Sequence, residues 1–218
     1  MCDERTEQDI KKYVTRGGKL NRRDFSKLSA AVGLASFLPP VANAVDVIES
    51  NVEATTPDGV VDCYFVRPSE GKHPGVLIWP DILGLRPAFM AMGKRLAESG
   101  YSVLVVNPFY RDAKAPVVKV GDTFGDPAVR EVVLPMRQKL TAEANFTDAE
   151  ALVSFLDNQD AVDSGRKMGT TGYCMGGPIV MRTAAVSPNR IGAIASFHGG
   201  GLATDQDDSP HLLIPDTN

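Results

Sequence analysis

The stretch Thr171-Gly172-Tyr173-Cys174-Met175-Gly176-Gly177 decides how the rest of the chain is interpreted. The residues before it, 165–170, have the pattern of a short strand entered from a turn, and residues 178–185 have that of a helix. A nucleophile between two glycines, with one residue on each side, is typical of a sharp strand–turn–helix junction. Such a turn brings the positions two before and two after the nucleophile together, so both must nearly lack a side chain. Gly172 and Gly176 meet this requirement.

Cys174 is therefore the candidate nucleophile. A helix N-terminus favours the thiolate form of a cysteine, which is the reactive form. The alternative is a small buried residue in a glycine-rich turn, a common role for cysteine. The complete Gly-x-Cys-x-Gly-Gly pattern favours the nucleophile.

Composition limits the possible functions. The 218 residues suit one domain of ordinary size, and 43% hydrophobic with 23% charged residues is typical of a globular protein. The formal net charge is −4 and the body of the chain has no basic run, which argues against a nucleic-acid partner. The cysteines Cys2, Cys63 and Cys174 fit neither a zinc site nor a disulfide framework, and no phosphate-binding loop is present. We therefore expect no metal and no cofactor.

Residues 1–44 have the features of a twin-arginine export signal. Asn21-Arg22-Arg23-Asp24-Phe25-Ser26-Lys27 supplies the paired arginines, and a modestly apolar stretch runs from Leu28 to Leu38. Ala42-Asn43-Ala44 then offers small residues for cleavage. This order predicts export by the twin-arginine machinery to the periplasm or beyond, with residues 45–218 as the folded domain. The alternative is an amphipathic N-terminal helix.

Hydrophobic periodicity predicts an α/β domain after the signal. The β–α–β order of its apolar segments indicates parallel strands with right-handed crossovers. Residues 111–135 carry several prolines and glycines and are expected to be irregular and to roof a pocket. The expected elements are a hairpin of strands 51–55 and 60–66, strands 75–79, 101–106, 165–170 and 191–197, and helices 88–99, 145–158 and 178–185.

Three motifs together resemble the dienelactone hydrolase family. They are the cysteine turn, the loop Pro80-Asp81-Ile82-Leu83-Gly84-Leu85, and Asn107-Pro108-Phe109-Tyr110-Arg111 after the next strand. The similarity runs from about residue 52 to about residue 202. It implies an α/β-hydrolase fold, with a mostly parallel central sheet and helices on both faces. It also implies hydrolysis of a small carboxylated lactone or ester.

The resemblance assigns the first catalytic steps to particular residues. Cys174 corresponds to the nucleophile that attacks the carbonyl, and the backbone N–H groups of Met175 and Ile82 correspond to the oxyanion donors. Asp81 stands where the family has a glutamate that helps to keep the nucleophile poised, and it is one methylene shorter.

The resemblance also assigns residues that contact substrate. Arg111 corresponds to an arginine that binds a substrate carboxylate, and the alternative for it is a solvated loop charge. His198 directly follows a strand, which is too early for the catalytic histidine, and we expect it to line the pocket or cap the strand.

The acid and the histidine of a catalytic triad should follow the nucleophile in that order. None of the candidates after His198 follows a strand of its own; they are Asp205, Asp207, Asp208, His211 and Asp216. We therefore expect the acid and histidine beyond Asn218 and the domain to be incomplete at its C-terminus. Two other functions stay open: a catalytically impaired binding protein on a hydrolase fold, and an exported redox-active thiol protein.

Overall fold

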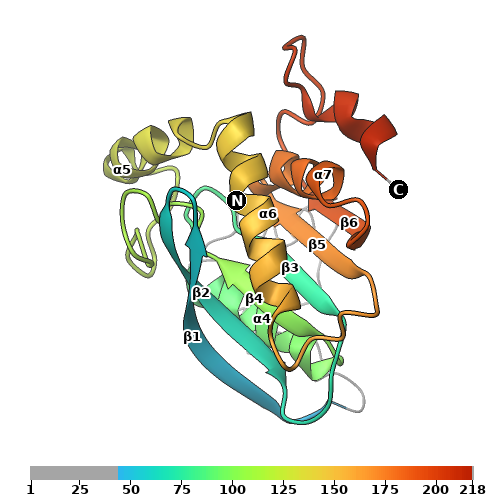
Figure 1. Cartoon of the computed structure of the whole chain (residues 1–218). Helices are drawn as coiled ribbons and strands as arrows, with labels where there is room; N and C mark the ends of the chain where they lie inside the picture. The colour runs from blue at the N-terminus through green and yellow to red at the C-terminus, as the bar shows by residue number, and fades with distance from the viewer. Residues whose placement is uncertain (1–43, 218) are drawn as a thin grey trace, which may run out of the picture.

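The computed structural model describes residues 44–217, and they form one sheet with helices packed on it (Figure 1). The six strands are arranged in the order β1-β2-β4-β3-β5-β6. Residues 1–43 of the expected export signal, Cys2 included, lie outside the described residues. In the described part, no helix is long and apolar enough to cross a membrane.

One edge of the sheet is the predicted hairpin. Strands β1 (Val47–Thr56) and β2 (Gly59–Pro68) pair antiparallel around a turn at Pro57 and Asp58. Gly59 closes this turn at φ +142°, a backbone conformation that favours glycine. On its other side, β2 pairs antiparallel with β4 (Ser102–Val106).

The remaining strands are parallel, as the β–α–β order predicted. β3 (Gly75–Trp79) lies between β4 and β5 (Met168–Tyr173), and β6 (Ile191–Phe197) pairs with β5. Every residue of β3 and β4 is buried, which explains why both sequences are continuous apolar runs. A mostly parallel sheet of the predicted fold class is therefore confirmed.

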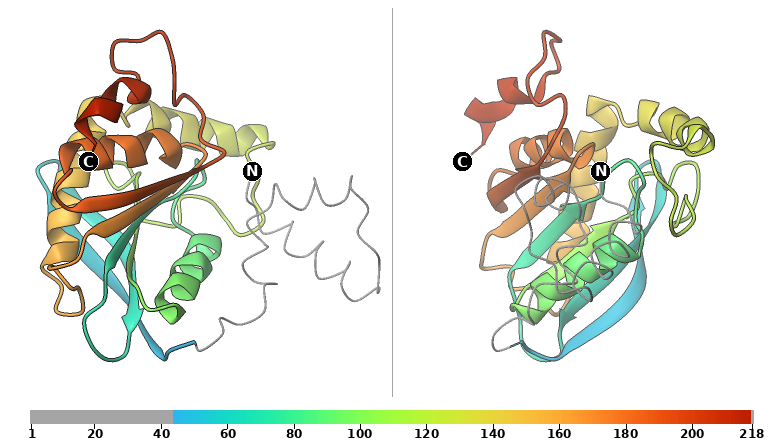
Figure 2. Two further views of the ribbon diagram at one scale, coloured as in Figure 1. Left: turned by 90° about the vertical axis from the view of Figure 1, so that its right-hand side faces the viewer. Right: turned by 180° about the vertical axis from the view of Figure 1, so that it is seen from behind.

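Helices cover both faces of the sheet, on opposite sides in Figure 2. Val76 and Ile78 of β3 pack in one apolar cluster with α4 (Pro87–Glu98), whereas Leu77 and Trp79 pack in another with the opposite helices. Those helices are α6 (Ala142–Asp157) and α7 (Gly176–Val186), which also contact each other. Successive side chains of β3 thus point to opposite faces of the sheet and contribute to two separate hydrophobic cores.

One prediction for the connecting segments was wrong. Residues 111–135 were expected to be irregular, but their last part belongs to helix α5 (Pro127–Gln138), even though Pro135 lies inside that helix. Near the C-terminus, η1 (Pro210–Asp216) is a 3₁₀ helix. Helix α5 is held by a third apolar cluster. This cluster joins α5 and the loop before it to the loops at the carboxyl edge of the sheet. Its buried members are Ile82, Leu83, Phe109, Val118, Val129, Val133, Leu140 and Met175.

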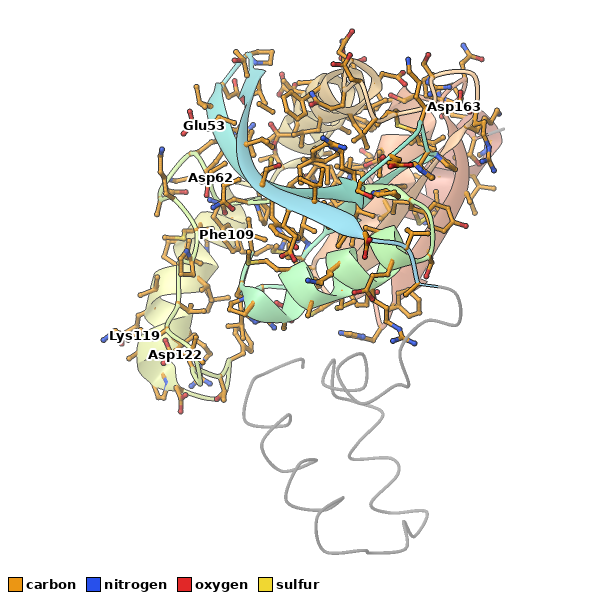
Figure 3. The ribbon with its side chains drawn as sticks, turned by 90° about the horizontal axis from the view of Figure 1, so that it is seen from below. Glu53, Asp62, Phe109, Lys119, Asp122 and Asp163 are labelled. Carbon is orange, nitrogen blue, oxygen red and sulfur yellow. The ribbon has the colours of Figure 1, made fainter. Side chains whose placement is uncertain are left out.

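Figure 3 shows this segment from below, with Phe109 close to the sheet and Lys119 and Asp122 at its far end. The backbone N–H of Lys119 donates to the Asp122 carboxylate, which closes the loop before α5. The segment therefore covers part of the carboxyl edge with a packed helix, and its predicted role as the roof of a pocket stays a prediction.

Candidate active site

Cys174 lies between the end of β5 and the start of α7, at the carboxyl edge of the parallel strands. Its backbone is in the left-handed region, at φ +51°, which costs a residue with a Cβ about 1–2 kcal/mol. The Cys174 N–H donates to Phe197 O at 3.0 Å, and Cys174 O accepts from Gly177 N–H at 3.1 Å. Strain that neighbouring bonds hold in place is characteristic of functional sites.

The two glycines of the motif are required by contacts between backbones. A Cβ on Gly172 would lie 2.2 Å from Gly176 O, and a Cβ on Gly176 would lie 2.4 Å from Trp79 O. Neither position can hold a side chain unless the backbone moves. The turn is therefore clamped between the end of β3 and the start of α7, in the strand–turn–helix arrangement that the spacing predicted.

The two described cysteines differ sharply in accessibility. Both are free thiols; Cys63 is buried in β2, whereas Cys174 is partly exposed. Burial raises the pKa of the Cys63 thiol, with the Asp62 carboxylate adding to this, so Cys63 stays protonated and shielded. Cys174 is thus the described thiol that a small molecule can reach.

Two backbone N–H groups, one after Cys174 and one in the loop after β3, have no acceptor among the described residues. Within residues 44–217, the N–H groups of Met175 and Ile82 donate to no carbonyl or side chain. The side chains of both residues pack in the same apolar cluster, under α5. These are the two donors that the resemblance assigned to the oxyanion, and unclaimed N–H donors, such as that of Met175 at the start of α7, suit an anionic oxygen.

The Asp81 carboxylate is not directed at the thiol by any hydrogen bond in the described structure. It is fully buried and forms an ion pair with Arg86, whose Nη1 lies 2.7 Å from Asp81 Oδ1 and whose Nη2 lies 3.0 Å from Oδ2. Asp81 Oδ1 also accepts from Leu83 N–H at 3.0 Å. The predicted action of Asp81 on Cys174 stays a prediction, and this geometry favours a part in shaping the loop.

Arg111 is paired with two carboxylates of the protein itself. Its guanidinium donates to Asp148 on α6, with Nη1–Oδ2 and Nη2–Oδ1 distances of 2.8 Å, and to Asp58 in the β1–β2 turn, with Nη2–Oδ2 of 2.6 Å. It also lies over the Tyr110 ring, 4.6 Å from the centroid. The resemblance implied that Arg111 binds a substrate carboxylate. In the structure its guanidinium instead binds the carboxylates of Asp148 and Asp58.

His198 directly follows β6, beside the cysteine turn, at φ +44°. Its ring contacts Tyr173 at 6.4 Å between centroids, and Tyr173 stacks on Phe197 at 4.9 Å. Desolvation lowers the pKa of His198, and the Asp81 carboxylate partly opposes this. His198 therefore lies beside the cysteine turn at the end of β6, and its predicted place in the pocket lining stays a prediction.

No acid–histidine pair is assembled in the part of the chain that the structure describes. The His211 Nδ1 bonds Ser209 Oγ, and neither His198 nor His211 has a hydrogen bond to a carboxylate. His73 is occupied by two backbone carbonyls, those of Gly100 and Glu70. Among these residues there is likewise no group of three His, Cys, Asp or Glu that could hold a metal ion.

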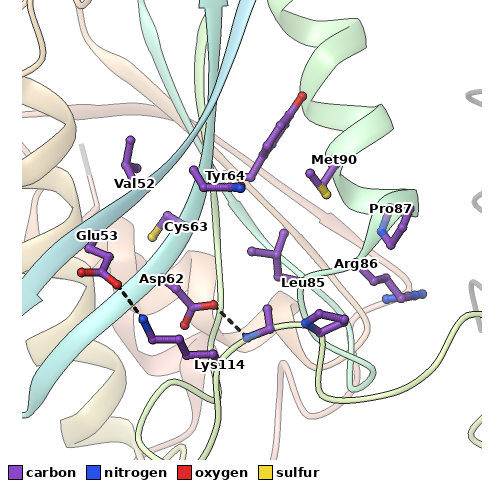
Figure 4. Close-up of a pocket in the computed structure, with 13 residues that line it drawn as sticks. Val52, Glu53, Asp62, Cys63, Tyr64, Leu85, Arg86, Pro87, Met90 and Lys114 are labelled. Carbon is purple, nitrogen blue, oxygen red and sulfur yellow. Dashed lines mark hydrogen bonds and ion pairs between the residues drawn. The ribbon is translucent and has the colours of Figure 1, made fainter.

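The sequence interpretation missed Arg86 and the packing of α5. Arg86 is 3% exposed, follows the quoted loop, and lines a pocket of about 740 Å³ between the β1–β2 hairpin and α4 (Figure 4). The signal for its role is an arginine five residues after a buried aspartate, a spacing that has meaning only once the loop's turn is known. The signal for α5 is the pair Val129 and Val133, one helical turn apart.

The fold and the strained cysteine turn together define an α/β-hydrolase. The sequence matches the model of the Dienelactone hydrolase family over residues 61–215, and the chain belongs to that family. The predicted resemblance is thereby confirmed.

The chain is also similar in sequence to bacterial carboxymethylenebutenolidases. The chain is 26% identical over 158 residues to the carboxymethylenebutenolidase of Rhodococcus opacus, which covers 72% of this chain and 56% of the relative. It is 29% identical over 162 residues to carboxymethylenebutenolidase 2 of Cupriavidus pinatubonensis, covering 72% and 60%. A Methylorubrum extorquens relative is 29% identical over 177 residues, covering 78% and 58%. The chain thus spans little more than half the length of these relatives.

Solved structures show the same fold. A Klebsiella pneumoniae structure superposes with a TM-score of 0.62 at 20% identity, covering 76% of this chain and 65% of that chain. The dienelactone hydrolase of Anabaena variabilis superposes with a TM-score of 0.56 at 15% identity, covering 79% and 70%. At such identities the agreement concerns the fold alone.

Proposed function

We propose that this protein is a carboxylic ester hydrolase of the dienelactone hydrolase type, which acts on small esters or lactones through a thioester on Cys174. One observation carries the proposal: a partly exposed cysteine is held in a strained turn at a helix start, beside two unclaimed N–H donors. A site of this kind suits addition of sulfur to a carbonyl, because the oxygen that gains charge finds its donors in place.

The first half-reaction follows from these groups. The Cys174 thiolate forms a bond to the carbonyl carbon, and the carbonyl π electrons move to the oxygen, which accepts hydrogen bonds from Met175 and Ile82 N–H. When the carbonyl re-forms, the carbon–oxygen bond to the leaving group breaks. The alkoxide takes a proton from solvent and leaves the acyl group on sulfur; in a lactone the alkoxide stays attached to that acyl group. Water then hydrolyses the thioester.

The substrate class rests on the relatives. The curated relatives named above are carboxymethylenebutenolidases, and a small carboxylated lactone or ester is the substrate we propose for this protein. Arg111 is already paired with Asp148 and Asp58. The proposal of a carboxylated substrate therefore does not rely on Arg111 to bind the substrate carboxylate.

Acylation by a chromogenic ester tests the proposal. With p-nitrophenyl acetate in excess, we expect a rapid release of about one equivalent of p-nitrophenol and an acetyl group on the peptide that contains Cys174. Cys174→Ala should abolish both, and Cys174→Ser should leave little. The matched control is Cys63→Ala, which should acylate normally because Cys63 is buried away from solvent. Full release by Cys174→Ala would rule out the proposed nucleophile.

A further inference from the structure

The buried pair of Asp81 and Arg86 closes the loop after β3. Asp81 is 0% exposed and Arg86 is 3% exposed, and both carboxylate oxygens receive a guanidinium N–H, at 2.7 and 3.0 Å. A planar fork on a planar carboxylate fixes the orientation of both groups. In Figure 4 the guanidinium lies beside Pro87, at the start of α4, and points away from Glu53 and Lys114.

The same two residues also bond several backbone groups of the loop. Asp81 Oδ1 accepts from Leu83 N–H at 3.0 Å, Asp81 O accepts from Gly84 N–H at 2.9 Å, and Arg86 Nη1 donates to Gly84 O at 3.2 Å. Gly84 permits this closure at φ +73°. The loop is therefore a hydrogen-bonded turn in which the next donor, Ile82 N–H, is left without a partner among the described residues.

This turn lies directly against the nucleophile. The Gly176 position is so close to the end of β3 that a Cβ there would lie 2.4 Å from Trp79 O and 3.0 Å from Pro80 O. The side chains of Ile82 and Met175 also pack in one apolar cluster. A shift of the turn would move Ile82 N–H relative to the fixed Met175 N–H.

We infer that Arg86 is a positioning residue of the active site, which acts through Asp81 to hold the Ile82 N–H where the oxyanion forms. The inference rests on the proposed function. Arg86 itself touches no reacting atom; it neutralises Asp81 and keeps that carboxylate on Leu83 N–H. In this role Asp81 acts as a member of the turn.

Arg86→Lys tests this role while keeping a positive charge, because an ammonium cannot replace the two-point contact of the fork. Removal of one oxyanion donor typically lowers the rate by about 10²–10³-fold, so a displaced donor should slow acylation by roughly 10-fold or more. Alkylation of Cys174 by iodoacetamide passes through a transition state without a carbonyl oxyanion. Its rate in Arg86→Lys should stay within about 2-fold of the wild-type rate at each pH. Arg86→Met should show a larger loss of acylation with the same alkylation profile.

Arg190→Met is the matched control. Arg190 forms a comparable two-point pair with Asp157, with Nε–Oδ2 and Nη2–Oδ1 distances of 2.6 and 2.7 Å, and it precedes β6 at the opposite edge of the parallel strands from Cys174. Its loss should leave acylation unchanged after correction for the folded fraction.

Hydrogen exchange keeps the inference independent of turnover. In Arg86→Lys the amides of Leu83 and Gly84 should exchange about 10-fold faster than in the wild type, whereas amides of β5 should not change. Unchanged exchange of these two amides would overturn the inference.

The kinetic results can overturn it as well. If the wild type acylates, unchanged acylation in Arg86→Lys would do so. Equal losses of acylation and alkylation would do so too, because they would show an effect on the thiol or the fold. A wild type that fails to acylate would count against the proposed function alone, and exchange would still decide whether Arg86 holds the turn.

Discussion

At the scale of single residues, neighbouring groups stabilise both the strained backbone of Cys174 and the charged side chains near it. Cys174 keeps a left-handed backbone because its N–H and C=O are bonded to Phe197 and Gly177. The arginines near the site are likewise occupied, Arg86 by Asp81 and Arg111 by Asp148 and Asp58. An arginine that already has carboxylate partners gains little from a substrate carboxylate, because it must first give those partners up.

Arg111→Ala should therefore act on stability more than on substrate choice. Asp148 is buried, and the loss of its guanidinium partner leaves a charge whose one remaining hydrogen bond within residues 44–217 comes from the Tyr110 hydroxyl. We expect a loss of roughly 2 kcal/mol or more in the free energy of unfolding, measured by urea denaturation. The ratio of kcat/KM between carboxylated and neutral esters should stay the same. A selective loss on carboxylated esters would instead show that Arg111 binds the substrate, as the family resemblance implied.

At the scale of helices and strands, the sequence predicted what local patterns determine. The bounds of β3 and β6 match the predicted strands because each is a short apolar run between turn residues. Gly172 and Gly176 marked the turn, because only glycine fits at those contacts. Helix α5 was missed because its stability comes from tertiary packing, which outweighs Pro135. The pair of Asp81 and Arg86 was missed because the resemblance suggested a partner for Asp81 across the fold.

The packing of α5 on the site can be tested with two neighbouring valines. Val133 is fully buried in the cluster that contains Met175, whereas Val132 is 43% exposed. Val133→Ala removes the equivalent of two buried methylene groups and should lower the free energy of unfolding by about 2 kcal/mol. It should also slow acylation of Cys174, because the roof over Met175 loosens. Val132→Ala, the control on the same helix, should change both quantities little; equal effects of the two would contradict this role of α5.

At the scale of the whole molecule, the two faces of the sheet are covered unequally. Helix α4 packs on β2 and β4, whereas β5 and β6 carry α7 on the opposite face. Ile194 and Phe197 of β6 are 43% and 50% exposed, and a groove of about 550 Å³ runs between α4 and β6. Strand β6 is also an edge of the described sheet, and its seven residues contain no charge and no proline. Natural edge strands usually carry such residues because they prevent pairing with other chains.

A fragment limited to residues 44–217 should therefore self-associate through β6. We expect its weight-average mass in sedimentation equilibrium to rise with concentration, and Ile194→Lys to suppress that rise because a lysine must stay hydrated at the edge. Val60→Lys is the control: Val60 is 52% exposed, but its strand, β2, lies between β1 and β4. This control should associate as the wild type does. A wild type that stays monomeric, or an equal effect of the two lysines, would show that the β6 edge is not the surface that associates. Suppression by Ile194→Lys alone would locate the association at this apolar edge, on the same strand whose last carbonyl holds the Cys174 N–H.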